Sequence, residues 1–198
     1  MKLLAFSDLH RDLEQGARLV EMSAEADVVI GAGDFASVHE GLEETVAVLA
    51  GIATPTVLVP GNNETVDALR DATRSWEAAT VLHGEGMTIA GTEFYGLGGG
   101  IPVTPWDWSF DLDDDEAGGM LAGCPEGAVL VLHSPPKGHC DSAGGDTHFG
   151  SPALLAAIEE KQPRLSVFGH IHEAWGCVSS VDGTPLRNLG PSGTWLEV

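Results

Sequence analysis

The chain has 198 residues, of which 43% are hydrophobic, so it can bury the core of one ordinary domain and is not a disordered chain. Thirty acidic residues against nine basic ones give a formal net charge of -21. Such a surface repels a phosphate backbone and an anionic bilayer, which excludes long nucleic acids and membranes as first candidates for partners. We therefore expect residues 1–198 to form a single domain that acts on a small substrate.

Targeting and cysteine signals favour the cytoplasm. Only four apolar residues follow Lys2 before the chain turns polar, which is too few for a signal-peptide core. No apolar stretch approaches the roughly 18 residues of a membrane helix. Cys124, Cys140 and Cys177 are odd in number and form no C-x-x-C pair, so we expect no disulfide framework and a reducing compartment. The oligomeric state stays open, with a homodimer as one alternative.

The first third of the chain predicts strands that alternate with helices. Apolar runs at 2–6, 28–30 and 56–59 predict three buried strands. Apolar residues at helical spacing predict helices over roughly 13–25 and 42–50, and a third helix is expected to follow the third strand. Strands that are apolar throughout and alternate with helices are typical of an α/β fold in which both faces of the sheet are covered.

The remainder predicts further strands and one long loop. A hairpin is expected over 87–97, and 98–126 reads mostly as loop with one helical segment. Buried strands are expected at 129–132 and 165–168, with a helix between them over 154–158. Short strands are expected at 177–181, 186–189 and 195–198. Because these last strands read as hairpins, we expect mixed rather than purely parallel sheets.

Polar side chains follow five of the predicted strands at the point where each strand ends. They are Asp8 with His10, Asp34, Asn62, His133, and His170 with His172. Binding sites of α/β sheets form outside the carboxyl ends of the strands, so these side chains are expected to converge. Oxygen and nitrogen donors without thiolates suit Mn, Fe, Zn, Co or Ni. Seven donors exceed the need of one ion, so we predict two divalent ions about 3.5–4 Å apart, with Asp34 as the bridge.

Each motif taken alone has an ordinary structural explanation. An Asp before a helix can be a cap, as Asp8 could be, and the pair Gly61-Asn62 is a common turn. A lone His133 is more often a hydrogen-bonded residue near the core than a ligand. The five motifs gain their weight from occurring together, in order, each at the end of a strand.

The same motifs resemble those of the calcineurin-like metallophosphoesterase superfamily over nearly the whole chain. The resemblance rests on Asp-Leu-His at 8–10, Gly-Asp at 33–34, Gly-Asn-Asn-Glu at 61–64, His133, and Gly-His-Ile-His at 169–172. Residues 133–136 and 165–173 are most similar to its small phosphodiesterase-type branch. The resemblance implies a four-layer α/β/β/α sandwich with two mixed sheets. It also implies that Asp8, His10, Asp34 and His172 hold one ion, and that Asp34, Asn62, His133 and His170 hold the other, with Mn expected in vitro.

The function implied by the resemblance is hydrolysis of small phosphoesters, either as a phosphodiesterase or as a phosphatase. A hydroxide bridging the two ions would attack phosphorus in line. Asp34 would hold both ions, Asn63 would donate to a phosphoryl oxygen, and His10 would lie near the leaving group as well as the metals. Many family members have His at the position of Asn63. An amide cannot supply a proton at pH 7, which leaves protonation of the leaving group open.

Two alternatives remain at this stage. The first is a metal-binding scaffold of the same fold that is catalytically idle, and only Asn63 favours it. The second is a hydrolase with one metal, such as an amidohydrolase, but the His-x-His expected at its first strand is missing because Asp8 holds that place. Two further features could act at the site or simply pack on the surface: Arg11, which could contact phosphate, and the aromatic loop at 106–110, which could stack a nucleobase or aryl group.

Overall fold

The computed structural model describes all residues, 1–198, and contains two β-sheets. The first sheet has the order β11-β1-β2-β3-β4. Its strands are β1 (Lys2–Phe6), β2 (Val28–Ala32), β3 (Thr56–Val59), β4 (Ala79–Val81) and β11 (Thr194–Glu197). β1 to β4 run parallel, and β11 is the antiparallel edge. The parallel register pairs Phe6 with Gly31, so the chain leaves β1 and β2 at the same level.

The second sheet has the order β5-β6-β7-β8-β10-β9. Its strands are β5 (Glu85–Ile89), β6 (Thr92–Leu97), β7 (Val129–Leu132), β8 (Leu165–Phe168), β9 (Val178–Val181) and β10 (Thr184–Asn188). The four central strands are parallel, and β5 and β9 are antiparallel edges. Both sheets are therefore mixed.

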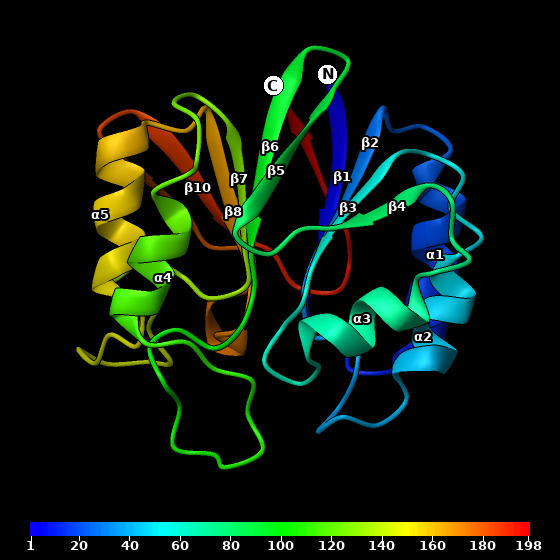
Figure 1. Ribbon diagram of the computed structural model, residues 1–198, viewed down its shortest axis with the longest axis horizontal. Helices are drawn as coiled ribbons and strands as arrows, with labels where there is room; N and C mark the ends of the chain where they lie inside the picture. The colour runs from blue at the N-terminus through cyan, green and yellow to red at the C-terminus, as the bar shows by residue number, and fades with distance from the viewer.

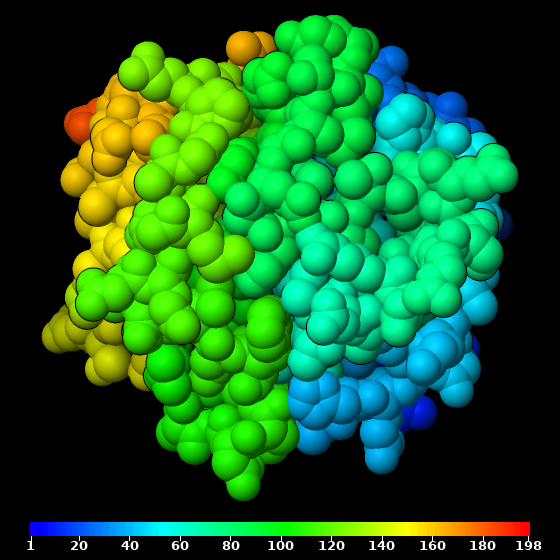
Figure 2. Space-filling model, viewed as in Figure 1, coloured from blue at the N-terminus to red at the C-terminus, as the bar shows by residue number.

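Helices cover the outer face of each sheet (Figure 1). α1 (Leu13–Ser23), α2 (Leu42–Leu49) and α3 (Val66–Ala72) lie on the first sheet, and α4 (Asp114–Leu121) and α5 (Pro152–Lys161) lie on the second. A short 3-10 helix, η1 (His172–Ala174), follows β8. The space-filling view shows the two halves in close contact along the middle of the molecule (Figure 2). This is the predicted four-layer α/β/β/α sandwich.

The strands are apolar at every position because both faces of each sheet are covered. In β1, Leu3 and Ala5 face the core between the sheets, whereas Leu4 and Phe6 face α1 and α2. In β7, Val129 and Val131 face the first sheet, whereas Leu130 and Leu132 lie in the core under α4 and α5. Successive side chains of a strand point to opposite faces, so a strand in the middle of four layers needs apolar residues at every position.

The predicted elements are found with shifted ends, and one strand was missed. β4 has only three residues, all half-buried, and its stretch of small and apolar residues at 78–82 is interrupted by Thr80. The loop at 98–126 contains the expected helix as α4, whose N-cap Asp113 forms a capping box with Glu116. None of the helices combines the length and the apolar character needed to cross a bilayer.

The expectation about cysteine pairing was wrong. Cys140 and Cys177 are joined by a disulfide across 37 residues, and Cys124 is the buried free cysteine. The loop after β7 and the segment after η1 lie far apart in sequence, but the parallel pairing of β7 with β8 brings them to the same edge of the sheet. Residue spacing alone cannot reveal a pair that this pairing creates.

Candidate metal centre

All seven predicted ligands lie at one end of the sandwich, where the parallel strands end. Asp8 follows β1, Asp34 follows β2, Asn62 follows β3, and His133 directly follows β7. Backbone hydrogen bonds align the first two loops: the N–H of Asp8 donates to the carbonyl of Gly33, and the N–H of His10 donates to the carbonyl of Asp34, both over 2.9 Å. The convergence therefore follows from strand register.

The backbone at the site is strained. Asp8, His10, Asp34 and His170 all have φ between 44° and 69°, a left-handed conformation that residues with a Cβ seldom adopt. Such conformations persist only where the surrounding structure enforces them, and they cluster at functional sites. Each aims a side chain back across the strand ends, into the space between the two sheets.

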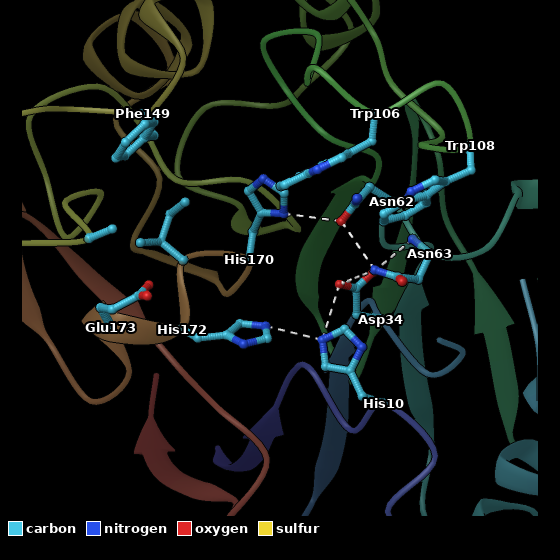
Figure 3. Close-up of a pocket in the computed structure, with 12 residues that line it drawn as sticks. His10, Asp34, Asn62, Asn63, Trp106, Trp108, Phe149, His170, His172 and Glu173 are labelled. Carbon is cyan, nitrogen blue, oxygen red and sulfur yellow. Dashed lines mark hydrogen bonds and ion pairs between the residues drawn. The ribbon is translucent and has the colours of Figure 1, made fainter. Parts of the chain in front are cut away.

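Four side chains form a first cluster with ligand atoms within 4.8 Å of one another: Asp8, His10, Asp34 and His172. Nε2 of His10 lies 3.1 Å from Nε2 of His172 and 3.5 Å from Oδ2 of Asp34. Nε2 of His172 lies 3.8 Å from Oδ1 of Asp8. Figure 3 shows the imidazoles of His10 and His172 facing each other below Asp34.

Asp34, His133 and His170 form a second cluster, and Asn62 lies within it. Oδ1 of Asn62 is 3.2 Å from Nε2 of His133 and 3.1 Å from Nδ1 of His170. The other carboxylate oxygen of Asp34, Oδ1, lies 3.5 Å from Nε2 of His133. Asp34 is thus shared, with one oxygen on each cluster.

The pKa values of the buried groups shift in opposite directions, and those of His170 and Asp34 shift toward the forms that bind a cation. Burial lowers the pKa of His170 to about 4, with the nearby His133 acting in the same direction, so this imidazole is neutral at pH 7. Burial by itself would raise the pKa of Asp34, but its interactions with the imidazoles, that of His133 above all, outweigh burial and hold the pKa below the usual value. The same interaction with Asp34, helped by Asp8, outweighs burial at His133 and raises the pKa of that imidazole. Burial raises the pKa of Asp8. A neutral imidazole beside a carboxylate is the form in which both bind metals.

Hydrogen bonds to backbone carbonyls fix which nitrogen of two imidazoles faces the site. Nδ1 of His133 donates to the carbonyl of Ala32 over 2.8 Å, and Nδ1 of His10 donates to that of Ala36 over 3.2 Å. The N–H of each ring is thereby assigned to Nδ1, and the lone pair of Nε2 points into its cluster. Backbone carbonyls orient metal-binding histidines in this way in many proteins.

The residues present fit a pair of divalent ions. Asn63 donates to Asp34, and Ser7 and Trp175 donate to Asp8. In contrast, the Nε2 atoms of His10, His133 and His172 meet only other groups of the two clusters. Bonds of about 2.1 Å from one ion place neighbouring ligand atoms roughly 3.0–3.4 Å apart, close to the 3.1–3.5 Å separations at this site. The ligand assignments themselves remain a prediction.

Glu64 supports the site and was missed as a functional residue, although it belongs to the recognised motif. Its buried carboxylate accepts hydrogen bonds from the backbone N–H groups of Asp34, Gly61 and Ala36 over 2.6–3.0 Å. It thereby ties the loop after β2 to the loop after β3. Burial, together with the charge of Asp34, raises the pKa of Glu64 to about 7.

Asp8 is held by hydrogen bonds that the sequence did not indicate. Nε1 of Trp175 donates to Oδ2 of Asp8 over 3.0 Å, and the ring of Trp175 lies 4.5 Å from that of His172, centroid to centroid. Oγ of Ser7 donates to the same oxygen over 2.5 Å and accepts from the N–H of Gly190. Trp175 thus touches two members of the first cluster. No spacing in the sequence connects it with Asp8.

Arg11, which the sequence offered as a phosphate contact, and several nearby polar residues lie outside the two clusters. Arg11 pairs with Glu40 over 3.4 Å on the surface. His139 bonds to Oγ of Ser179, and His148 pairs with Asp141. The amide of Asn188 donates to the carbonyls of Gly169 and Ile171, so the turn that begins at Asn188 packs beside the Gly-His-Ile-His loop.

The fold and the site together define an α/β sandwich with a centre of two Asp, four His and one Asn side chains between its sheets. Residues 1–174 match the family described as calcineurin-like phosphoesterase, and the chain belongs to that family. A relative with half of the chain aligned is the human metallophosphoesterase domain-containing protein 1, which is 37% identical over 106 residues. That match spans 50% of this chain and 30% of the human protein, so the chain covers about a third of this relative's length.

Solved structures share the fold at low sequence identity. TT1561 of Thermus thermophilus superposes with a TM-score of 0.77 at 17% identity, covering 96% of this chain and 90% of that protein. A dimetal phosphatase from Danio rerio gives a TM-score of 0.66 at 12% identity, covering 96% and 88% respectively. At these identities the likeness shows the architecture alone.

Proposed function

We propose that the chain is a two-metal hydrolase of small phosphoesters, either as a phosphodiesterase or as a phosphatase. One observation carries the proposal: the buried Asp34 directs Oδ2 toward His10 and Oδ1 toward His133, each over 3.5 Å. A carboxylate shared between two donor clusters is the arrangement expected of two ions held about 3.5–4 Å apart. The family membership and the printed name of the Danio rerio neighbour support the same chemistry.

The chain's own residues would divide the work by cluster. Asp8, His10, Asp34 and His172 would hold one ion, and Asp34, Asn62, His133 and His170 the other, with Mn as the metal to use in vitro. When bound, the ions would supply a nucleophilic hydroxide at neutral pH and positive charge for the phosphoryl oxygens. The carbonyls of Ala32 and Ala36 would keep His133 and His10 in their binding tautomers throughout.

The role expected for Asn63 changes with the structure. Nδ2 of Asn63 donates to Oδ2 of Asp34 over 2.8 Å, and its Oδ1 accepts from the N–H of Val38. One of the two N–H groups of Nδ2 would thereby orient the shared carboxylate, and the other would remain for a phosphoryl oxygen because Asn63 also lines the cavity. The proton for the leaving group would then come from water, because an amide cannot supply one and His10 would keep its N–H on the carbonyl of Ala36.

The charges on the surface support a small substrate over a polyanion. Six of the nine basic side chains pair with carboxylates: Lys2, Arg11, Arg18, Arg70, Arg74 and Lys161. A nucleic acid would need a cluster of free cations to neutralise its phosphates. A cytoplasmic location and a homodimer stay predictions, and the disulfide weakens the cysteine argument for the first.

Metal content and hydrolysis, measured together, test the proposal. Protein stripped with a chelator and reloaded with Mn should bind two ions per chain and hydrolyse bis(p-nitrophenyl) phosphate. Asp34→Ala should bind at most one ion and lose hydrolysis by more than about a hundredfold, whereas Asp67→Ala, an exposed control on α3, should match the wild type. Full activity of Asp34→Ala would overturn the two-metal assignment.

The same measurement distinguishes an active hydrolase from a catalytically idle metal-binding scaffold. A scaffold would bind both ions through the same seven side chains but hydrolyse no phosphoester under any condition. Of the two readings the catalytic one is favoured, because every ligand position is filled and the site opens onto a cavity of about 500 Å³. A scaffold for protein interaction needs no such cavity.

A further inference from the structure

Two aromatic side chains flank the mouth of the cavity above the metal-binding side chains (Figure 3). Trp106 comes from the loop after β6 and is 50% exposed, and Phe149 comes from the loop before α5 and is 49% exposed. Both line the cavity together with Asp34 and His170. Large apolar rings left half in water, beside a polar centre, leave a surface that a ligand can cover.

The tryptophan loop is fastened to a predicted metal ligand. Oγ of Ser109 accepts from Nδ2 of Asn62 over 2.8 Å and donates to Oδ1 of Asp111 over 2.6 Å. The N–H of Phe110 also donates to the carbonyl of Asn62. These bonds hold the loop at a fixed distance from the second cluster, so Trp106 is part of the site's geometry rather than a loosely placed surface residue.

Trp106 also has a rigid backing. Its ring stacks on that of Trp108 with centroids 5.6 Å apart and planes within 16°. The carbonyl of Trp108 accepts from Nε2 of His39, which belongs to the loop after β2. One face of Trp106 is thus occupied by a second ring. The bonds from His39 and Asn62 join this loop, which follows β6 of the second sheet, to two loops of the first sheet.

The cavity wall has no lysine or arginine and carries Glu173 as well as Asp34. Positive charge is therefore available only at the metal centre. A ligand with one phosphoryl group finds its counter-charge there, whereas further negative charge on the ligand would meet Glu173 and the apolar rings. The aromatic walls offer stacking to a flat ring, and stacking of this kind depends on planarity rather than on hydrogen-bond pattern.

Resting on the proposed function, we propose that Trp106 and Phe149 are specificity-determining residues that select phosphoesters with one phosphoryl group and a flat, uncharged aromatic ring, attached either directly or through a sugar. A phenol and a nucleobase share this chemistry. Glu173 disfavours rings that carry an additional negative charge. The assignment names the substrate class of the site and gives a function to the aromatic loop.

Binding to the Mn-loaded protein tests the proposal with pairs of ligands that differ in planarity. Phenyl phosphate should bind at least about fivefold more tightly than cyclohexyl phosphate, or uridine 5′-monophosphate more tightly than its dihydrouridine counterpart. A preference for the flat ligand in the first pair indicates a phenol, and a preference in the second pair indicates a nucleobase. Trp106→Leu should abolish the preference, and Trp195→Leu, on β11 away from the cavity, should keep it.

Charge and phosphate controls complete the test. 4-Carboxyphenyl phosphate should bind more weakly than phenyl phosphate to the wild type, and Glu173→Gln should narrow that gap. Equal affinity for the flat and the puckered ligand in both pairs, with inorganic phosphate still bound, would overturn the aromatic selection alone. Absence of phosphate binding and of hydrolysis would instead show that the proposed function fails.

Discussion

Asn63 holds the carboxylate of Asp34 from two sides. Its backbone N–H donates to Oδ1 over 2.9 Å, and its side-chain Nδ2 donates to Oδ2 over 2.8 Å. Asn63 is buried, and its own Oδ1 is fixed by the N–H of Val38. The residue that stands where many relatives have histidine therefore sets the orientation of the shared carboxylate.

Replacement of Asn63 should lower the affinity of the protein for Mn. Asn63→Ala removes the donor to Oδ2 of Asp34, and loss of such a supporting bond typically lowers metal affinity 10- to 100-fold. Calorimetric titration of the stripped protein with Mn measures the change. A variant with unchanged metal affinity but a raised KM would place Asn63 on the substrate instead.

The rate of hydrolysis should depend on the leaving group. Asn63 stands in the place of the histidine and its amide cannot supply a proton, whereas a positioned acid typically contributes about 10²- to 10⁴-fold. Rates for a series of aryl phosphodiesters should therefore fall as the pKa of the phenol rises. The measurement is the slope of log rate against that pKa. A flat profile, with chemistry shown to be rate-limiting, contradicts the expectation.

Trp175 should support the first ion specifically. Trp175→Phe keeps a ring beside His172 but removes the N–H that donates to Asp8. We expect one of the two Mn binding steps to weaken about tenfold while the other is unchanged. Trp195→Phe is a matched control, because both tryptophans are 39% exposed. Equal losses in the two variants would show a general effect of surface tryptophans rather than support of Asp8.

Glu64 should make the metal-free protein less stable as the pH rises. Its pKa is raised from 4.5 to about 7 in the folded protein, so the native state holds this proton where the unfolded chain has lost it. The unfolded state then binds fewer protons between these values, and the free energy of unfolding falls with rising pH, by roughly 3 kcal/mol in total for this group. Below pH 4.5 the contribution is fully retained.

Urea denaturation in the presence of a chelator, from pH 4.5 to 8, checks this contribution. Glu64→Gln has no proton to lose, so the wild-type minus variant difference in unfolding free energy isolates the carboxyl. The difference should decline as the pH increases, whereas Glu21→Gln, on the exposed face of α1, should show no trend relative to the wild type. A difference that grows with pH would mean that Glu64 is ionised in the folded protein.

The sequence by itself predicted buried strands alternating with helices, and it indicated which polar residues follow the ends of those strands. Apolar runs without alternation, such as 28–32, require burial on both faces, and polar residues directly after them fall at one edge because parallel strands end together. Those two facts place Asp8 and Asp34 near each other before any coordinates are known, whereas His133 joins them only because the two sheets pack with these strand ends together. They depend only on periodicity and on the direction of the strands.

Only the tertiary structure decided which groups support the ligands and which surround the substrate. Trp175 reaches Asp8 across 167 residues, His133 bonds to Ala32 across the two sheets, and Cys140 meets Cys177. The physical reason is that such contacts are set by the packing of one layer against another and by the path of long loops. Local sequence patterns record the periodicity of one strand or helix, and they carry no information about which neighbour the fold will bring to it.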